Sequence, residues 1–187
     1  MKIVLCPNPF RDKGLKAAKS SETLLRAAGV HTECCFPFPV DKNNIGEIDP
    51  TIKIKEMKTE LPDADFLVCF GGDGTILHAA KDASSFGVPI VGVNMGSVGF
   101  MAELEQNELS QLTRLVSGEY TLENRMLLDV RVIRDGRVIF RSVALNDAVI
   151  TKGAVARVID LQVYGDKILI SNIFGDGVIL APPTGST

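Results

Sequence analysis

The sequence predicts an α/β layer built on a parallel sheet, followed by an antiparallel β-rich region. Short apolar runs alternate with helical periodicities over about the first 120 residues, as they do when helices connect parallel strands. After about Leu122 the pattern changes to apolar and polar residues in strict alternation, interrupted by turn residues. We therefore expect an α/β domain over residues 1–122 and a β-rich domain, incomplete at its C-terminus, over residues 123–187.

The predicted elements of the first region follow one another in strand–helix order. Apolar runs predict strands, and residues 65–70 are apolar almost throughout, as in a parallel strand covered on both faces. Helical spacing of apolar residues predicts helices between them, and the highly charged segment 51–60 is expected to be a short helix. The expected strands are 2–6, 30–36, 65–70 and 88–93, and the expected helices are 15–28, 51–60, 75–83 and 108–116.

The second region contains two hairpin signals. The pair Asp135-Gly136 stands between two apolar–polar alternations, which is a strong signal for a two-residue hairpin turn. A second hairpin is expected around Gly165-Asp166. Because the sequence stops at Thr187 inside a glycine-rich turn, we expect this chain to be a fragment whose β domain lacks its closing strands.

Composition narrows the class of protein. The 187 residues carry a net charge of −3, which gives no basis for non-specific attraction to nucleic acid or to an anionic membrane. No apolar stretch approaches the length of a membrane span. Cys6 and Cys69 lie in apolar runs and are interpreted as small buried hydrophobes rather than metal ligands, which favours a reducing, cytoplasmic location.

The strongest chemical signal is Gly71-Gly72-Asp73-Gly74-Thr75, between a buried strand and a helix. Glycines let the backbone approach a ligand closely, and the free N–H groups of a helix start suit a phosphate chain. Asp73 adds a carboxylate that can hold Mg²⁺ or accept a proton from an attacking hydroxyl. The alternative is a tight turn in which Asp73 or Thr75 only caps the helix; the position at the end of a parallel strand favours a ligand site.

Three further clusters and one histidine are candidates. Asn94 and Gly96 lie in a glycine-rich loop after the 88–93 strand. Asn146 and Asp147 interrupt an apolar run, and buried polar groups need partners there. Asp176 stands in a Gly-Asp-Gly turn that leads to the hydroxyls of Thr184, Ser186 and Thr187. For each cluster, ligand recognition competes with ordinary turn chemistry, and for His78 a half-exposed helix position is the simpler interpretation.

Taken in order, the four clusters resemble the NAD kinase family over residues 71–187. The resemblance implies NAD held between an α/β and a β-rich domain, ATP as phosphate donor, a divalent metal, usually Mg²⁺, and a homodimer or homotetramer. It assigns Asp73 as the catalytic aspartate and Gly71, Gly72, Gly74, Asn94 and Gly96 to the ATP phosphate loop. It assigns NAD binding to Asp73, Gly74, His78, Asn146, Asp147, Asp176, Thr184 and Thr187.

The sequence departs from the family pattern at several points. Asp147 replaces a more common Glu, and Ala181-Pro182 replaces a pair usually built from hydroxyl residues. Two alternatives stay open. A lipid kinase of the diacylglycerol or sphingosine type shares the Gly-Gly-Asp-Gly-Thr loop, and a non-catalytic nucleotide-binding module would keep the fold without turnover.

Overall fold

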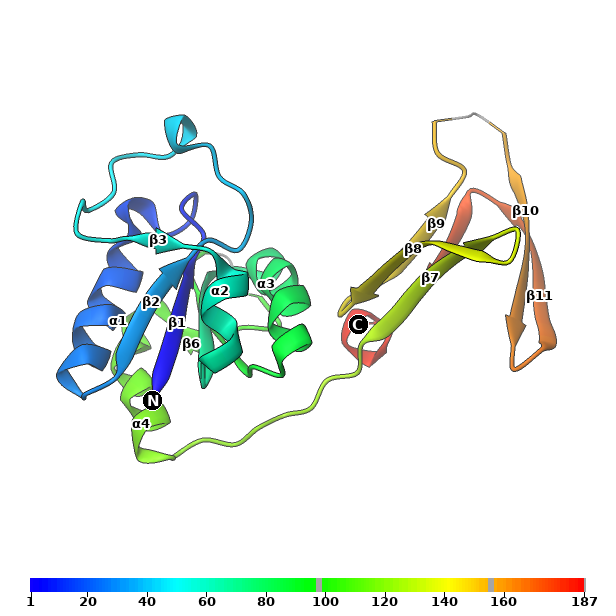
Figure 1. The fold of residues 1–187 in the computed structure, drawn as a ribbon. Helices are drawn as coiled ribbons and strands as arrows, with labels where there is room; N and C mark the ends of the chain where they lie inside the picture. The colour runs from blue at the N-terminus through cyan, green and yellow to red at the C-terminus, as the bar shows by residue number, and fades with distance from the viewer. Residues whose placement is uncertain (97–98, 155–156, 187) are drawn as a thin grey trace. The chain divides into compact units, whose positions relative to one another are not determined.

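The computed structural model describes residues 1–96, 99–154 and 157–186. The chain divides into two compact units, Met1–Glu123 and Asn124–Thr187, and each is described by itself. The first unit is a six-stranded sheet with helices, and the second consists of antiparallel strand pairs (Figure 1). This confirms the predicted fold class.

Every strand pair in the six-stranded sheet is parallel, and the strand order is β3-β2-β1-β4-β5-β6. From β1 the chain builds the sheet outward in one direction, then returns to place β4 on the other side of β1. The order therefore reverses between β1 and β4. The strands are β1 Lys2–Pro7, β2 His31–Cys35, β3 Ile54–Lys55, β4 Phe66–Gly71, β5 Ile90–Asn94 and β6 Leu104–Glu105.

Both faces of the central strands are buried. Ile3 and Leu5 of β1 belong to a core cluster with Leu25 of α1 and Leu112 of η4. The alternating residues Val4 and Cys6 point to the opposite face and have no exposed surface. Helix α1 packs on β1 and β2, whereas α3 packs on β4 and β5. The helical segments are η1 Lys13–Leu15, α1 Lys16–Ala27, η2 Lys42–Asn44, α2 Met57–Glu60, η3 Leu61–Asp63, α3 Asp73–Phe86, η4 Gln106–Thr113 and α4 Arg114–Ser117.

Three predicted elements have different bounds. The helix expected over 51–60 is wrong in its first half, because Ile54–Lys55 pairs with β2 as an edge strand and only Met57–Glu60 is helical. The helix expected from Thr75 begins at Asp73 and continues to Phe86. The segment 108–116 is mostly a 3₁₀ helix, η4, that continues into α4.

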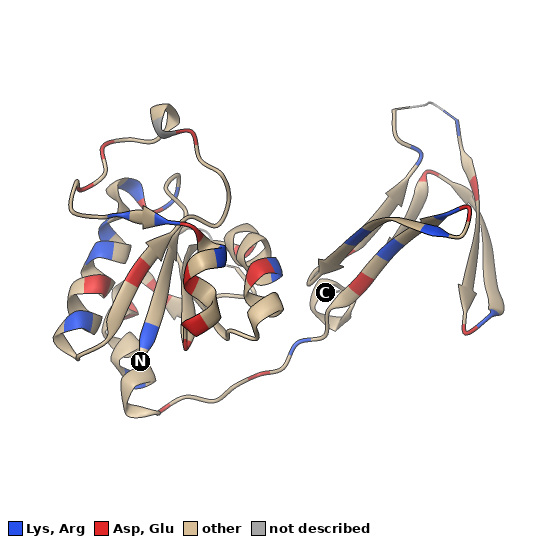
Figure 2. Ribbon diagram, viewed as in Figure 1, with Lys and Arg blue, Asp and Glu red and all other residues tan. Residues whose placement is uncertain are grey.

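Acidic and basic residues are interspersed along α1, α2 and α3 (Figure 2).

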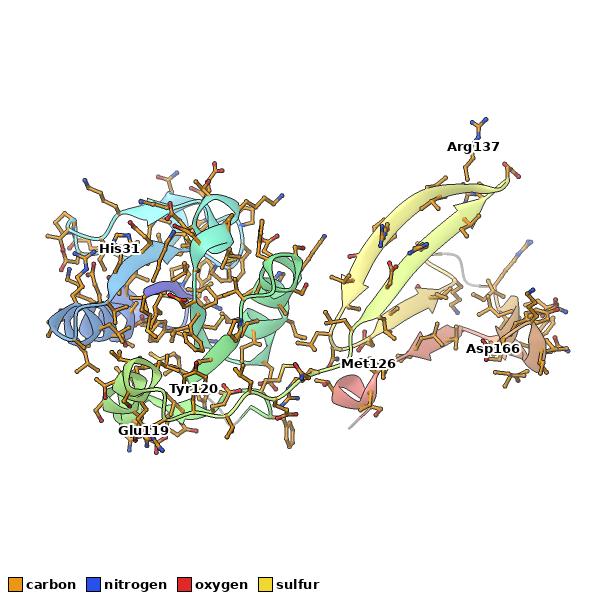
Figure 3. The ribbon with its side chains drawn as sticks, turned by 60° about the horizontal axis from the view of Figure 1, so that its bottom comes forward. His31, Glu119, Tyr120, Met126, Arg137 and Asp166 are labelled. Atoms are coloured by element: carbon orange, nitrogen blue, oxygen red, sulfur yellow. The ribbon has the colours of Figure 1, made fainter. Side chains whose placement is uncertain are left out.

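The chain leaves the first unit through Tyr120, whose ring packs edge-on against Phe66 with 5.1 Å between ring centroids (Figure 3). The second unit contains three antiparallel pairs: β7 with β8, β10 with β11, and β12 with β9. Their bounds are β7 Leu128–Arg134, β8 Arg137–Ala144, β9 Ala148–Thr151, β10 Ile159–Gly165, β11 Ile168–Gly175 and β12 Gly177–Leu180, followed by the 3₁₀ turn η5 Pro183–Gly185.

Both predicted hairpins are present. The β7–β8 turn is Asp135-Gly136, and both residues have positive φ, as a tight primed turn requires. The β10–β11 turn is formed by Asp166 and Lys167, one position later than expected, because Gly165 pairs with Ile168. Figure 3 shows Asp166 at the tip of its hairpin. Among the described residues, the buried hydrophobic side chains all lie in the first unit, between Ile3 and Leu115.

Candidate functional site

The first candidate site lies at the carboxyl edge of the parallel sheet, where the strand order reverses. Pro7 of β1 pairs with Phe70 of β4, and Gly71 of β4 pairs with Asn94 of β5. The loops that follow these three strands therefore begin side by side. Open α/β sheets bind ligands at such a reversal, outside the carboxyl ends of the strands.

Gly71 and Gly72 bring α3 directly onto the end of β4. A Cβ atom on Gly71 would lie 2.1 Å from Oγ1 of Thr75, so only glycine allows this approach. Gly72 is the N-cap of α3, and no side chain caps the helix. The alternative in which Asp73 or Thr75 only caps the helix is therefore not what the structure shows. The uncapped first turn, with Asp73 in it, leaves backbone N–H groups and the positive end of the helix dipole for an anion.

The carboxylate of Asp73 is oriented by a distant loop. The backbone N–H groups of Phe100 and Met101 donate to Oδ2 and Oδ1 of Asp73, each at 3.1 Å. Gly99 allows this contact, because a Cβ there would lie 2.3 Å from Oδ1 of Asp73. A carboxylate has about four lone-pair sites, so each oxygen keeps a position for a proton or a metal ion.

The Asn94 side chain stabilises the loop after β5 through hydrogen bonds. This side chain is buried, its Nδ2 donates to both carboxylate oxygens of Glu105 at 3.1 and 3.2 Å, and its Oδ1 accepts the N–H of Gly96. In this conformation the Asn94 side chain shapes the loop, and the exposed Gly96 is the part of this pair that faces outward. Ser97 and Val98 of the predicted glycine-rich loop lie outside the described residues.

The loop after β1 belongs to the same site and was not predicted as functional. Nδ2 of Asn8 donates to Oγ1 of Thr75 at 3.0 Å, which ties this loop to the first turn of α3. A terminal nitrogen of Arg11 lies 3.7 Å from the position that a Cβ on Gly96 would take. In the sequence this loop shows only a polar residue between two prolines, directly after a buried strand. That pattern is equally typical of an ordinary turn.

A buried carboxylate fixes the end of this loop. Oδ1 and Oδ2 of Asp12 accept the N–H groups of Ala17 and Ala18, both at 2.9 Å, and the Asp12 side chain is buried. Burial raises the pKa of the Asp12 carboxyl above its ordinary value, and the N–H donors of α1 oppose that rise. Asp12 thus joins the Asn8–Asp12 loop to α1, and Asn8 joins the same loop to α3.

His78 lies on α3 away from the glycine turn and is exposed. Its ring packs edge-on against Phe38, with 5.2 Å between centroids, and Phe38 in turn stacks with Phe10 at 6.3 Å. The structure thus places His78 beside two aromatic rings.

The second candidate site lies in the second unit, where two predicted clusters meet. Asn146 and Asp147 interrupt the predicted apolar run by standing between β8 and β9, outside both strands. Nδ2 of Asn146 donates to Oδ2 of Asp147 at 2.8 Å. Gly185 lies against the Asn146 backbone, since a Cβ on Gly185 would be 1.7 Å from the Asn146 carbonyl oxygen. Thr184 is next to this contact in the chain.

Asp176 lies at the other end of the same strand pair. Leu180 of β12 pairs with Ala148, next to Asp147, whereas Gly177 pairs with Thr151. At 3.3 Å per residue these ends are roughly 10 Å apart. The Asp176 side chain is exposed and pairs with Lys152 at 2.7 Å. Thr187, also a predicted site residue, lies outside the described residues.

Two other kinds of site are absent from the described residues. Over residues 1–96, 99–154 and 157–186, His, Cys, Asp and Glu side chains form no group of three suited to hold a metal ion. None of the helices in those ranges has the length and apolar character needed to cross a membrane.

Residues 15–120 match a family model described as the ATP-NAD kinase N-terminal domain. The NAD kinase of Acetivibrio thermocellus is 34% identical over 188 residues, covering 100% of this chain and 63% of the relative. That of Symbiobacterium thermophilum is 43% identical over 126 residues, covering 67% and 44%. The chain thus spans about 63% of the length of the first of these curated relatives.

Two solved structures share the fold. Yeast NADH kinase in complex with NADH superimposes with a TM-score of 0.81 at 22% identity, covering 100% of this chain and 59% of that one. An NAD kinase from Archaeoglobus fulgidus in complex with ATP superimposes with a TM-score of 0.63 at 23% identity, covering 100% and 62%.

Proposed function

Because the chain belongs to the NAD kinase family, we propose that it transfers the γ-phosphate of ATP to the 2′-hydroxyl of the adenosine ribose of NAD, giving NADP. The observation that carries the proposal is the carboxylate of Asp73, held by two backbone N–H groups at the uncapped start of α3. This arrangement supports a mechanism in which a proton acceptor lies beside a site for phosphates.

The glycine turn supplies the phosphate half of the reaction. Phosphoryl transfer needs in-line positioning, neutralisation of charge and a group that takes the proton of the attacking hydroxyl. Gly72 and Gly74 leave space beside the first-turn N–H groups, since a Cβ at either position would meet no atom within 4 Å. In our proposal the triphosphate lies there, and Asp73 accepts the proton from the ribose hydroxyl.

In our proposal the divalent metal binds at the phosphate part of the site. Mg²⁺ is usually bound through one or two carboxylates together with substrate phosphates rather than by a full protein cage. A single carboxylate, Asp73, beside a phosphate site fits that donor set. If Asp73 serves the metal instead of accepting the proton, it would hold the ion, and the ion would neutralise charge on the transferred phosphate.

The NAD half is assigned to the second unit. Asn146, Asp147, Thr184 and Gly185 form one cluster, and Asp176 lies beyond the other end of the β9–β12 pair, whose ends are roughly 10 Å apart. An extended dinucleotide has polar groups at both ends, which suits two polar clusters separated in this way.

We also propose that the protein is a homodimer or homotetramer, which sedimentation velocity measures directly.

The proposal is tested by following the label from γ-³²P-ATP in the presence of Mg²⁺. Label on NAD is the expected result. Label on diacylglycerol or sphingosine in vesicles would identify a lipid kinase instead, and label on neither acceptor would identify a non-catalytic binding module. Asp73→Asn is the control, since the label on NAD must depend on that carboxylate.

A further inference from the structure

Three aromatic rings from three separate elements form a ledge at the carboxyl edge of the first unit. Phe10 follows β1, Phe38 follows β2, and His78 lies on α3. Phe10 and Phe38 are nearly parallel, with 12° between their planes, and His78 meets Phe38 edge-on. The Phe10 side chain is 51% exposed, and neither phenylalanine belongs to the core cluster of the unit.

The ledge is held in place relative to the proposed phosphate site. The N–H of Phe10 donates to Oδ1 of Asn8, and Nδ2 of the same Asn8 donates to Thr75 in the first turn of α3, both at 3.0 Å. His78 follows Asp73 by five residues on that helix, or about 7.5 Å along its axis. One asparagine thus couples the aromatic ledge to the glycine turn.

Arg11 extends from the same loop toward the other side of the site. Its guanidinium lies near Gly96, in the loop after β5, and has no hydrogen-bond or ion-pair partner within the part of the chain that the structure describes. The Asn8–Arg11 segment therefore presents an aromatic face at one end and an unpaired cation at the other, with the uncapped start of α3 alongside.

We infer that this segment binds the phosphate donor: the nearly parallel rings of Phe10 and Phe38 stack on the adenine ring of ATP, His78 borders that stack edge-on, and Arg11 contacts the phosphates of ATP. Aromatic side chains commonly stack on nucleotide bases, and this stacking does not depend on which base is bound, because every base has a π-face. A free guanidinium beside open backbone N–H groups suits the larger charge of a triphosphate better than the pyrophosphate of NAD. The inference rests on the proposed function, because it names the subsite for the donor in that reaction.

The test is calorimetric binding of ATP, inorganic tripolyphosphate and NAD to the chain and its variants. Phe10→Leu and Phe38→Leu should weaken ATP on the order of tenfold and leave tripolyphosphate unchanged, whereas Phe10→Tyr should bind ATP like the parent chain. Arg11→Gln should weaken ATP and tripolyphosphate alike. Phe86→Leu, an exposed position at the far end of α3, is the matched control.

Several results would overturn the ledge as a donor site. These are loss of NAD rather than ATP in the two leucine variants, equal loss of ATP and tripolyphosphate, no loss at all, or no ATP binding by the parent chain. Thermal melting of each variant reports whether it is folded. A chain that binds ATP through the ledge but places no label on NAD contradicts the proposed function alone. A chain that makes NADP with insensitive ledge variants contradicts the ledge alone.

Discussion

The carboxylate of Asp73 accepts a hydrogen bond from the backbone N–H of Phe100, 27 positions later in the chain, at 3.1 Å. With the N–H of Met101 on the other oxygen, this contact joins the loop after β5 to the first turn after β4. An exposed carboxylate at a helix start would otherwise sample several rotamers. The two donors select one orientation before any substrate binds, which is the preorganisation that phosphoryl transfer requires.

Gly99→Ala should impair the reaction without unfolding the protein. The new methyl group would have to occupy a position 2.3 Å from Oδ1 of Asp73, so the carboxylate or the loop must move. A displacement of about 1 Å at a reacting group can cost roughly 100-fold in rate. Steady-state formation of NADP measures the loss. Gly46→Ala is the matched control, because no atom lies within 4 Å of its added Cβ; similar rates for both variants would contradict the role given to this contact.

Glu60→Gln should lower stability at neutral pH but not in acid. Lys2 donates to Glu60 at 2.9 Å where both side chains are about nine-tenths buried, and this bond lowers the pKa of the Glu60 carboxyl below its ordinary 4.5. A depressed carboxyl pKa stabilises the fold above about pH 4.5 and stops doing so as the pH falls through the folded-state pKa.

We expect the Gln variant to lose about 1 kcal/mol in the free energy of unfolding at pH 7. This loss in the free energy of unfolding should be smaller below pH 4.5. Denaturant titration at pH 7 and below pH 4.5 measures the difference. Asp63→Asn is the control, because Asp63 also bonds to Lys2 but is mostly exposed and should matter less. A deficit that persists unchanged in acid would show that packing, not charge, is responsible.

Asn146→Ala should weaken NAD and spare ATP. The change removes the amide that bonds to Asp147, and a polar group at a ligand site is worth roughly 1–3 kcal/mol when its bond is lost. The KM for NAD should therefore rise about tenfold or more while the KM for ATP stays within twofold. Asn172→Ala, an exposed position on β11, carries the same substitution outside the cluster. Equal changes for both substrates would count against assigning Asn146 to NAD.

Local patterns in the sequence predicted the strands and hairpins well. The apolar runs that became β1, β4 and β5, and the Asp135-Gly136 turn, depend on neighbouring residues, so local patterns suffice to find them. Two-residue edge strands such as β3 contain too few positions to show a period. The charged segment before α2 was assigned to a helix for that reason.

The site was predicted only where its residues carry their own signal. Gly71 to Asp73 stand out because glycines and an acid follow a buried strand. Arg11 and the Asp73–Phe100 contact do not, because both depend on how loops after different strands meet at one edge of the sheet. Such meetings follow from strand order, which short-range patterns leave open.

Asp73→Asn should abolish the chemical step while leaving NAD binding near that of the parent chain. Loss of a general base typically costs on the order of 10²–10⁴-fold in rate. The structure adds a second expectation: Phe100 N–H and Met101 N–H donate to different oxygens of Asp73, so in this geometry an Asn side chain, which has one oxygen, leaves one of them facing its NH₂ group. Hydrogen exchange at one of these amides should therefore accelerate in the variant.

The two roles of Asp73 separate when kcat and exchange are measured together. A kcat loss of 10²-fold or more with normal NAD affinity by calorimetry supports the base. A loss that excess Mg²⁺ restores assigns the carboxylate to the metal instead. Gly99→Ala disturbs the same hydrogen bonds but keeps the carboxylate, so its smaller loss measures how much of the Asp73→Asn effect is orientation. If Asp73→Asn leaves kcat within a few-fold, Asp73 is no base, and the proposed mechanism is wrong.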